Sequence, residues 1–172
     1  GDLQVTITAD RYNNQYEHNG DGILASTAES NNTATANIVS SIAPYADLQV
    51  QNLTVDPTSL HSGEVLHITW SDANTGALAT NANWYDRILI VNTSTGATLL
   101  NTTLYHNHAT EGPVAAGGAL ARGYDFTLPN GDAGVGNLQI TVTTDIYNYQ
   151  YEYNAGGTAE DNNSANTAAT AT

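Results

Sequence analysis

The chain contains no cysteine, methionine or lysine, and its 172 residues hold only three strongly basic side chains, all arginines. Without cysteine there is no disulfide bond, no catalytic thiolate and no cysteine-bound zinc or iron–sulfur cluster. Seventeen acidic residues give a formal net charge of −14. Nucleic acids and anionic membrane surfaces recruit lysine and arginine, so we expect neither as a partner. Divalent cations are the natural counter-charge.

Long apolar runs are also missing. No stretch approaches the run of about 18 apolar residues that a membrane-spanning helix needs, so we expect no membrane insertion. The segment Gly1–Val5 lacks the basic and apolar regions of a signal peptide, so an exported chain would be a piece of a longer protein. Apolar residues make up 40% and charged residues only 12%, which favours a folded core over charge-driven disorder.

The most informative feature present is an internal repeat. Residues 1–17 read GDLQVTITADRYNNQYE and residues 136–152 read GNLQITVTTDIYNYQYE, so eleven of seventeen positions are identical. The similarity resumes at residues 29–33 and 160–164, after a loop that is four residues longer in the first copy. The repeat period is therefore about 130 residues.

This repeat predicts two domains. We expect residues 1–43 to be the C-terminal strands of a preceding like repeat, with residues 1–40 paired as strands in the way that residues 136–170 are paired. Residues 44–172 should be one complete repeat. Two strands cannot bury a face alone, so the first part should pack against a neighbouring repeat of the same or another chain.

The hydrophobic patterns alternate with period two, which is typical of strands. Runs of strand length are separated by turn signals rich in glycine, proline and asparagine. About seven short strands in the complete repeat predict an all-β fold, an immunoglobulin-like antiparallel β-sandwich in tandem. We expect Trp70 and Trp84 to fill the space between the sheets. The strand-length runs are 48–50, 65–70, 86–91, 97–104, 120–128 and 138–142.

Both copies carry the same acidic, asparagine-rich pattern. An aspartate ends a strand, a glutamate follows seven residues later, and a Glu-x-Asn-Asn segment lies beyond a glycine-bearing loop. Carboxylate and amide oxygens suit calcium, so we predict Ca²⁺ sites here. In the open alternative, the same residues cap turns and solvate a loop. The candidate ligands are Asp10, Glu17, Glu29, Asn31 and Asn32 in the first copy, and Asp145, Glu152, Glu160, Asp161, Asn162 and Asn163 in the second.

Strand geometry limits how one ion could be bound. Asp145 and Glu152 differ in parity, so on an unbroken strand their side chains would face opposite sides. The chain must therefore bend or bulge between them if both contact the same ion.

Four tyrosines at alternate positions follow the second aspartate. Tyr147 and Tyr151 recur in the first copy, and we expect them to pack. Tyr149 and Tyr153 are replaced there, by asparagine and histidine, so we expect these two to be exposed and to be candidates for contact with a glycan or a protein partner.

Catalytic motifs are not recognisable, and we predict a non-enzyme. His106 and His108 should share one face of a strand, but without a nearby third ligand we favour a loop role over zinc binding. The sequence has no Gly-x-Ser-x-Gly elbow, phosphate loop or dinucleotide fingerprint. A pair of acids for glycoside hydrolysis would have to coincide with the predicted ion sites.

Several motifs together resemble the CARDB module, the cell adhesion related domain found in bacteria. The resemblance covers about residues 46–170. It implies an immunoglobulin-like sandwich strung in tandem within large secreted or surface-anchored bacterial proteins, often adhesins, and a structural role for Asp86 and Arg87. The segment 105–113 is longer and more polar than the module leads us to expect. The matching motifs are Asp47-Leu48-Gln49-Val50, Trp70, Asn74-Thr75-Gly76, Trp84-Tyr85-Asp86-Arg87, Leu128-Pro129-Asn130-Gly131 and Asn162-Asn163.

These observations lead to one main hypothesis and two alternatives. The main hypothesis is a non-enzymatic, calcium-stabilised repeat module of a large extracellular bacterial adhesin or of a surface or biofilm matrix fibre. The first alternative is a β-sandwich that binds a glycan or a host surface through exposed tyrosines. The second is an accessory domain beside a secreted hydrolase.

Overall fold

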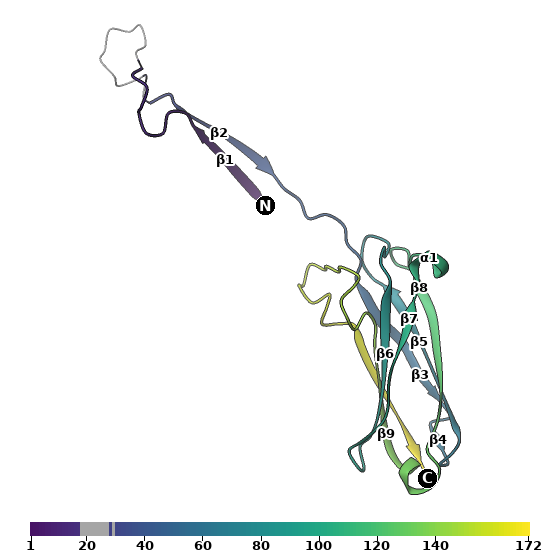
Figure 1. Ribbon diagram of the computed structural model, residues 1–172. Coiled ribbons are helices and arrows are strands. Elements are labelled where there is room, and N and C mark those ends of the chain that lie inside the picture. Colours follow the sequence, from purple (N-terminus) through teal and green to yellow (C-terminus); the bar gives the residue numbers. More distant parts are fainter. Residues whose placement is uncertain (18–27, 29) are drawn as a thin grey trace. The chain divides into compact units, whose positions relative to one another are not determined.

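The computed structural model describes residues 1–17, 28 and 30–172. The chain forms two compact units, Gly1–Ala43 and Pro44–Thr172 (Figure 1). Strands dominate both units, and in the part of the chain that is described no helix has the length and apolar character needed to cross a membrane.

The first unit contains a two-stranded antiparallel sheet of β1 (Asp2–Thr8) and β2 (Thr33–Val39). Its register runs from Thr8 opposite Thr33 to Asp2 opposite Val39. In the second unit, Thr143 lies opposite Ser164, which is the same register once the repeat is aligned. The expected strand pairing is therefore confirmed for Asp2–Thr8 and Thr33–Val39.

The second unit is a sandwich of two sheets, which confirms the predicted all-β, immunoglobulin-like fold. Its strands pair antiparallel except for the short parallel contact between β4 and β10, and an isolated parallel bridge joins Ala46 to Glu152. One sheet has the order β4 (Ser59–Leu60), β10 (Ser164–Ala171), β9 (Gly136–Thr143), β6 (Trp84–Asn92), β7 (Ala97–His106). The other has the order β3 (Leu48–Asp56), β5 (Val65–Asn74), β8 (Ala119–Thr127).

The core lies between these sheets and follows from the period-two pattern. Alternate residues of β6 are buried, and those of β5 and β9 follow the same pattern. Trp70 and Trp84 are buried as expected, and Trp84 stacks on His106 with ring centroids 3.6 Å apart. The main buried cluster consists of Val50, Val55, Leu60, Leu66, Ile68, Trp70, Ile88, Ile90, Leu128, Leu138, Ile140, Val142, Ala169 and Ala171.

Two short helical turns interrupt the strands: α1 (His108–Glu111) and η1 (Gly131–Gly134). The expectation that His106 and His108 share a strand face is wrong, because β7 ends at His106 and His108 begins α1. Asn107 causes the change: its backbone is extended, and its Oδ1 accepts a hydrogen bond of 3.0 Å from the backbone N–H of Ala109. α1 and the loop after β9 lie at the same end of the sandwich (Figure 1).

Candidate functional site

The first predicted ligand, Asp145, organises a tight turn after β9. Its two carboxylate oxygens accept backbone hydrogen bonds of 2.9 Å from Tyr149 and 2.8 Å from Gln150. Asp145 itself has a positive φ of 44°, so the strand direction is lost at this residue. This is the bend that parity requires between Asp145 and Glu152.

Asp10 builds the same turn in the first unit. Its carboxylate oxygens accept hydrogen bonds of 2.8 Å each from the backbone N–H groups of Asn14 and Gln15, and its φ is 38°. The recurrence shows that the aspartate at this position has a local structural role in both copies.

Glu152 is the most unusual acid of the set. It is only 4% exposed, and its Oε2 accepts a 2.7 Å hydrogen bond from the backbone N–H of Leu48 at the start of β3. Its Oε1 is buried without a hydrogen-bond partner. A buried carboxylate oxygen without a partner is energetically costly, so this atom points to a missing proton or cation.

Asp47, which the ligand prediction did not include, lies beside Glu152. It is buried, and its Oδ1 accepts a 3.0 Å hydrogen bond from Asn162 Nδ2. Its Oδ2 accepts hydrogen bonds from Thr75 Oγ1 at 2.9 Å and from Asn154 Nδ2 at 3.3 Å. The loop after β9 is thus connected to the start of β3 by side chains of both segments.

Asn74 holds Asp47 in place. The Asn74 Oδ1 accepts backbone hydrogen bonds of 3.1 Å from both Asp47 and Gly76, while its Nδ2 donates to the carbonyls of Leu78 and Val114. A Cβ at Gly76 would lie 2.4 Å from the carbonyl oxygen of Tyr45. The Asn74-Thr75-Gly76 motif therefore has a structural explanation, because no residue with a Cβ fits at its third position.

The remaining predicted ligands of the second copy are spread around this loop. Glu160 is exposed, and its carboxylate accepts a hydrogen bond from the backbone N–H of Glu152. Asp161 is exposed, whereas Asn163 is buried and its carbonyl accepts a 3.0 Å hydrogen bond from the Thr144 backbone. The Asn162 side chain donates its Nδ2 hydrogen bond to Asp47 Oδ1.

In the first copy, the carbonyl of Asn32 accepts a 2.8 Å hydrogen bond from Ala9, which matches the Asn163 contact. Glu17 is half-buried and Asn31 is exposed. Glu29 lies outside the described residues.

Burial and mutual repulsion raise the pKa values of acids in the second copy. Burial, reinforced by the charges of Glu160, Asp145 and Asp47, raises the pKa of Glu152 to about 8. Burial also raises the pKa of Asp145 to about 6, although its two backbone hydrogen bonds oppose the shift. These acids therefore form one electrostatically connected group that a cation would stabilise.

The described side chains alone do not form a complete metal site. Among residues 1–17, 28 and 30–172, no group of three or more acidic or histidine side chains is arranged to hold a metal ion. A hollow of about 250 Å³ lies beside the loop, lined by Glu152, Tyr153, Asn154, Gly157, Ala159 and Glu160. Any cation here would need amide, backbone or water oxygens in addition to the carboxylates.

A second acidic cluster ties the two sheets together. Arg122 of β8 lies 3.0 Å from Asp86 of β6 and 3.4 Å from Asp72 of β5, and both aspartates are fully buried. Arg122 also lies 3.3 Å from Glu111 of α1. Burial raises the pKa of Asp72 well above its usual value, with the neighbouring charge of Asp86 adding to the effect. Asp86 is therefore structural, as the family resemblance implies.

The tyrosines differ from expectation. Tyr147 and Tyr151, expected to pack, are 54% and 65% exposed, whereas Tyr153, expected at the surface, is half-buried against Tyr45. The cause is the turn at Asp145, which removes the strand alternation on which the expectation depended. Tyr149 is 59% exposed, as expected.

A surface aromatic cluster results from this arrangement, with Tyr85 half-buried and its three neighbours exposed. Tyr85 of β6 lies 4.8 Å from Tyr105 of β7, 5.6 Å from Tyr147 and 6.2 Å from Tyr149, measured between ring centroids. We call these four residues the tyrosine cluster.

Comparison with known proteins identifies the fold. No family model and no curated protein matches the chain. It is similar to the crystal structure of a CARDB domain from Pyrococcus furiosus in complex with di-metal ions, with a TM-score of 0.53 and 18% identity over 76% of this chain and 97% of that one. The solution structure of a CARDB domain from the same organism has a TM-score of 0.51 and 19% identity to this chain. The match covers 75% of this chain and 97% of that one.

A domain ascribed to a cell surface protein of Methanosarcina acetivorans gives a TM-score of only 0.45 at 15% identity, over 73% of this chain and 93% of that one, and carries no argument. At the identities of the two CARDB structures, the likeness establishes the fold. The resemblance to the CARDB module is thus confirmed at the level of the fold.

Proposed function

We propose that this chain is a non-enzymatic structural repeat module of a large extracellular adhesin or surface fibre, and that calcium bound at Glu152 stabilises it. The observation that carries the proposal is the buried Glu152 carboxylate, whose Oε1 has no hydrogen-bond partner and whose pKa is raised by burial and by three neighbouring acids. The CARDB fold supports the assignment to a surface module.

The residues fit a hard cation with oxygen ligands. Glu152 and the adjacent Glu160 would supply carboxylate oxygens, and Asp47 adds a third negative charge nearby. Calcium accepts about six to eight oxygen ligands in flexible geometry, including backbone carbonyls and water, so it tolerates a site with few carboxylates. The P. furiosus CARDB domain, solved in complex with di-metal ions, supports metal binding by this type of module.

Calcium would supply positive charge, and residues of the chain would connect the loop to β3. Glu152 already joins the loop to β3 through the Leu48 backbone, and Asn162 joins it again through Asp47. A cation that neutralises Glu152 would therefore strengthen the connection between the last two strands and the start of the module. In a tandem protein this would stiffen the end of the sandwich at which Pro44–Asp47 enters.

Thermal unfolding with and without calcium tests the proposal. At about one hundred times Kd, binding to the folded state alone stabilises by about 2.7 kcal/mol, which corresponds to a rise in Tm of about 10 °C for a domain of this size. EDTA should remove the increase. Asp132→Asn is the matched control, because Asp132 is an exposed acid in η1 and its loss should leave the calcium response intact.

An unchanged Tm in calcium and EDTA would exclude calcium as a stabiliser. A calcium response of equal size in wild type and Glu152→Gln would place the ion elsewhere.

The tyrosine cluster favours a second candidate function, a module that binds a glycan. Aromatic rings on an outer surface provide flat apolar area with polar hydroxyl groups at the edges, which suits a surface exposed to a polar ligand. Glycan-array binding that Tyr149→Ala abolishes, and that Tyr12→Ala in the first unit leaves intact, would support it. Tyr153 is the weaker residue for this role, because it packs against Tyr45 with ring centroids 5.7 Å apart.

A further inference from the structure

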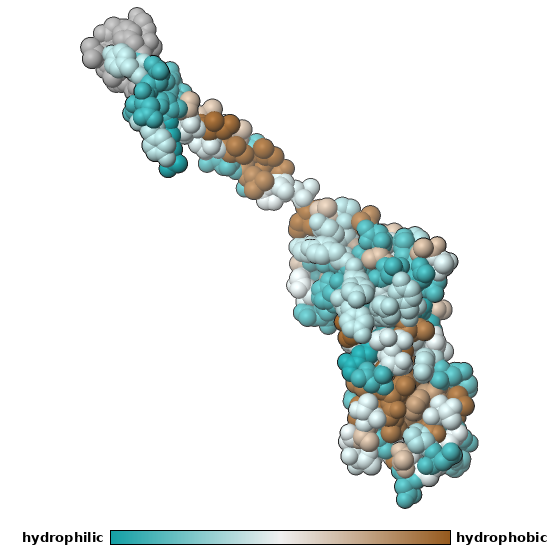
Figure 2. Space-filling model, viewed as in Figure 1, coloured by the Kyte–Doolittle hydropathy of each residue, from teal (hydrophilic) through white to brown (hydrophobic). Residues whose placement is uncertain are grey.

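The sheet of the first unit has one apolar face that nothing in the described structure covers. Leu3, Val5 and Ile7 of β1 and Ile38 of β2 lie on this face and are 55%, 44%, 69% and 52% exposed. Figure 2 shows apolar residues open on the surface of this unit. A two-stranded sheet is marginally stable alone, and large exposed apolar patches mark interaction sites.

The second unit shows what covers the same face. Leu138, Ile140 and Val142 of β9 occupy the repeat positions of Leu3, Val5 and Ile7, and they are 1%, 0% and 0% exposed. They belong to one buried cluster with residues of β3, β4, β5 and β6. The sequence similarity of the two hairpins therefore extends to a surface that is core in one copy and open in the other.

The free edge of β1 also differs between the two units, because the matching edge of β9 is paired. In the second unit, β9 pairs with β6 from Arg87 opposite Thr143 to Asn92 opposite Leu138. In the first unit, β1 pairs only with β2 among the described residues, so its other edge presents free backbone donors and acceptors. An open strand edge is a template for one further strand.

The side chains of the two hairpins also fill similar volumes. Val5 is one methylene smaller than Ile140, and Ile7 is one methylene larger than Val142, so the two differences cancel along the strand. Cores accept such exchanges when total volume is kept. On the second strand, Ile38 stands where the second unit has Ala169, which is the one clear enlargement.

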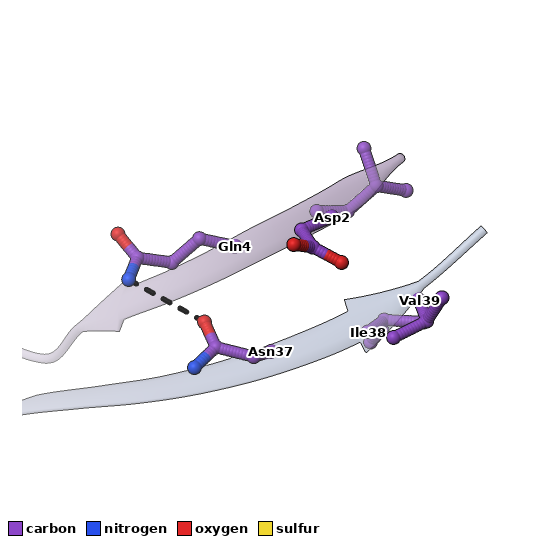
Figure 3. A pocket seen from close by; sticks show the side chains of 6 residues that line it. Asp2, Gln4, Asn37, Ile38 and Val39 are labelled. Carbon is purple, nitrogen blue, oxygen red and sulfur yellow. Dashed lines mark hydrogen bonds between the residues drawn. The ribbon is translucent and has the colours of Figure 1, made fainter.

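The surface hollow on this sheet is not a separate ligand pocket. It measures about 550 Å³ and is lined by Asp2, Leu3, Gln4, Asn37, Ile38 and Val39, all of which are exposed. Figure 3 shows Gln4 and Asn37 joined by a 3.4 Å hydrogen bond across the strands, with Ile38 and Val39 further along β2. An open site with no buried wall does not enclose a small molecule.

We propose that the β1–β2 sheet is an interface that receives the β3–β8 portion of a like repeat, with a β6-equivalent strand pairing along β1. A second copy of this chain is the poorer occupant, because its own β9 and β10 already cover that portion. The inference rests on the proposed function only in treating the chain as a repeat module, and it is independent of calcium and of adhesion.

A tandem chain tests this proposal. Residues 44–135 are copied ahead of Gly1, so that the 172-residue chain follows intact, and amide hydrogen exchange is measured by NMR. In the tandem chain, exchange of the β1 and β2 amides should slow by about a hundredfold or more relative to the 172-residue chain. Protected β9 and β10 amides in the same molecule report that the second unit is folded.

Three variants of the tandem chain sharpen the test. Ile7→Ser should abolish the protection, and Thr6→Ser, on the opposite face, should keep it. Ile38→Ala introduces the residue that the second unit has at the matching position, Ala169. Its β1 and β2 amides should exchange at least as slowly as those of the unmodified tandem chain. This variant therefore controls for a steric misfit of Ile38 in the interface.

Fast exchange of β1 and β2 in both the tandem chain and its Ile38→Ala variant, with β9 and β10 protected, would overturn the proposal. So would protection in the 172-residue chain that rises with protein concentration, because the occupant would then be a second copy. Neither result depends on calcium, so a failed calcium test and a failed interface test can be told apart.

Discussion

Glu152→Gln should stabilise the second unit when calcium is absent and should lack the stabilisation that calcium gives the wild type. Glutamine keeps an oxygen that can accept the Leu48 hydrogen bond, now made by Glu152 Oε2 at 2.7 Å. It removes the charge that burial disfavours, and it also removes the carboxylate that a cation needs. The two effects have opposite signs, so measuring each protein in EDTA and in calcium separates the cost of the buried charge from the contribution of the ion.

The size of the effect follows from the pKa. In the folded protein the pKa of Glu152 is raised from 4.5 to about 8. A raised pKa means that the folded state holds its proton more tightly than the unfolded state, so this contribution to stability is complete below pH 4.5 and is lost as the pH rises toward 8. At about 1.36 kcal/mol per unit, wild type loses about 3 kcal/mol from this group by pH 7.

Urea unfolding in EDTA between pH 5 and pH 8 measures this loss. Tryptophan fluorescence reports the second unit alone, because Trp70 and Trp84 are the only tryptophans and both are buried there. Asp145 also has a raised pKa, of about 6, and adds a loss of the same sign in both proteins. The difference between wild type and Glu152→Gln therefore reports the contribution of Glu152 together with its repulsion by Glu160, Asp145 and Asp47.

Equal pH dependence of the two proteins in EDTA would refute this reasoning. A variant that is less stable than wild type in EDTA at every pH would also contradict it, because the ionised carboxylate would then be stabilising without a cation.

Three further predictions concern the fold. Asp145→Ala leaves two backbone N–H groups without acceptors and should destabilise the second unit by about 2–3 kcal/mol in urea unfolding, whereas Asp145→Asn, which keeps one acceptor, should cost less. Arg122→Ala leaves two buried carboxylates without their counter-charge and should cost about 3–5 kcal/mol at pH 7, with a smaller loss at pH 4 because burial raises the pKa of both Asp72 and Asp86; an equal loss at both pH values would argue against it. Val142→Ser should cost about 2 kcal/mol or more, while Ile7→Ser, at the matching but exposed position, should change tryptophan-detected unfolding by less than about 0.5 kcal/mol.

Much of the fold could be predicted from local patterns. Period-two alternation identifies the long strands, and the identity between residues 1–17 and 136–152 identifies the paired strands of the first unit. Trp70 and Trp84 were predictable core residues because large apolar side chains gather between sheets. These features depend on neighbours along the chain or on the repeat itself.

The contacts that make the site were not predictable in the same way. Asp47 meets Asn162 across 115 positions of sequence, and Arg122 meets Asp86 across 36. Such pairs arise only when the two sheets stack, and no spacing in the sequence encodes them. One signal was available for Asp72, since it continues the buried alternation of Leu66, Ile68 and Trp70 on β5.

The tyrosine expectation failed for a local reason. It assumed a continuous strand after β9, but Asp145 and Asn148 both have positive φ and the chain turns. Aspartate and asparagine tolerate this conformation better than most residues, so their spacing could have indicated the turn.

The central claim is that a calcium ion occupies the pocket at Glu152. A crystal structure of the chain grown with calcium, and a second with a lanthanide in its place, tests it most directly. The proposed site predicts an anomalous peak within about 2.6 Å of a Glu152 carboxylate oxygen, lost in Glu152→Gln. Well-defined Glu152 density with no peak, in crystals saturated with the ion, would contradict the claim.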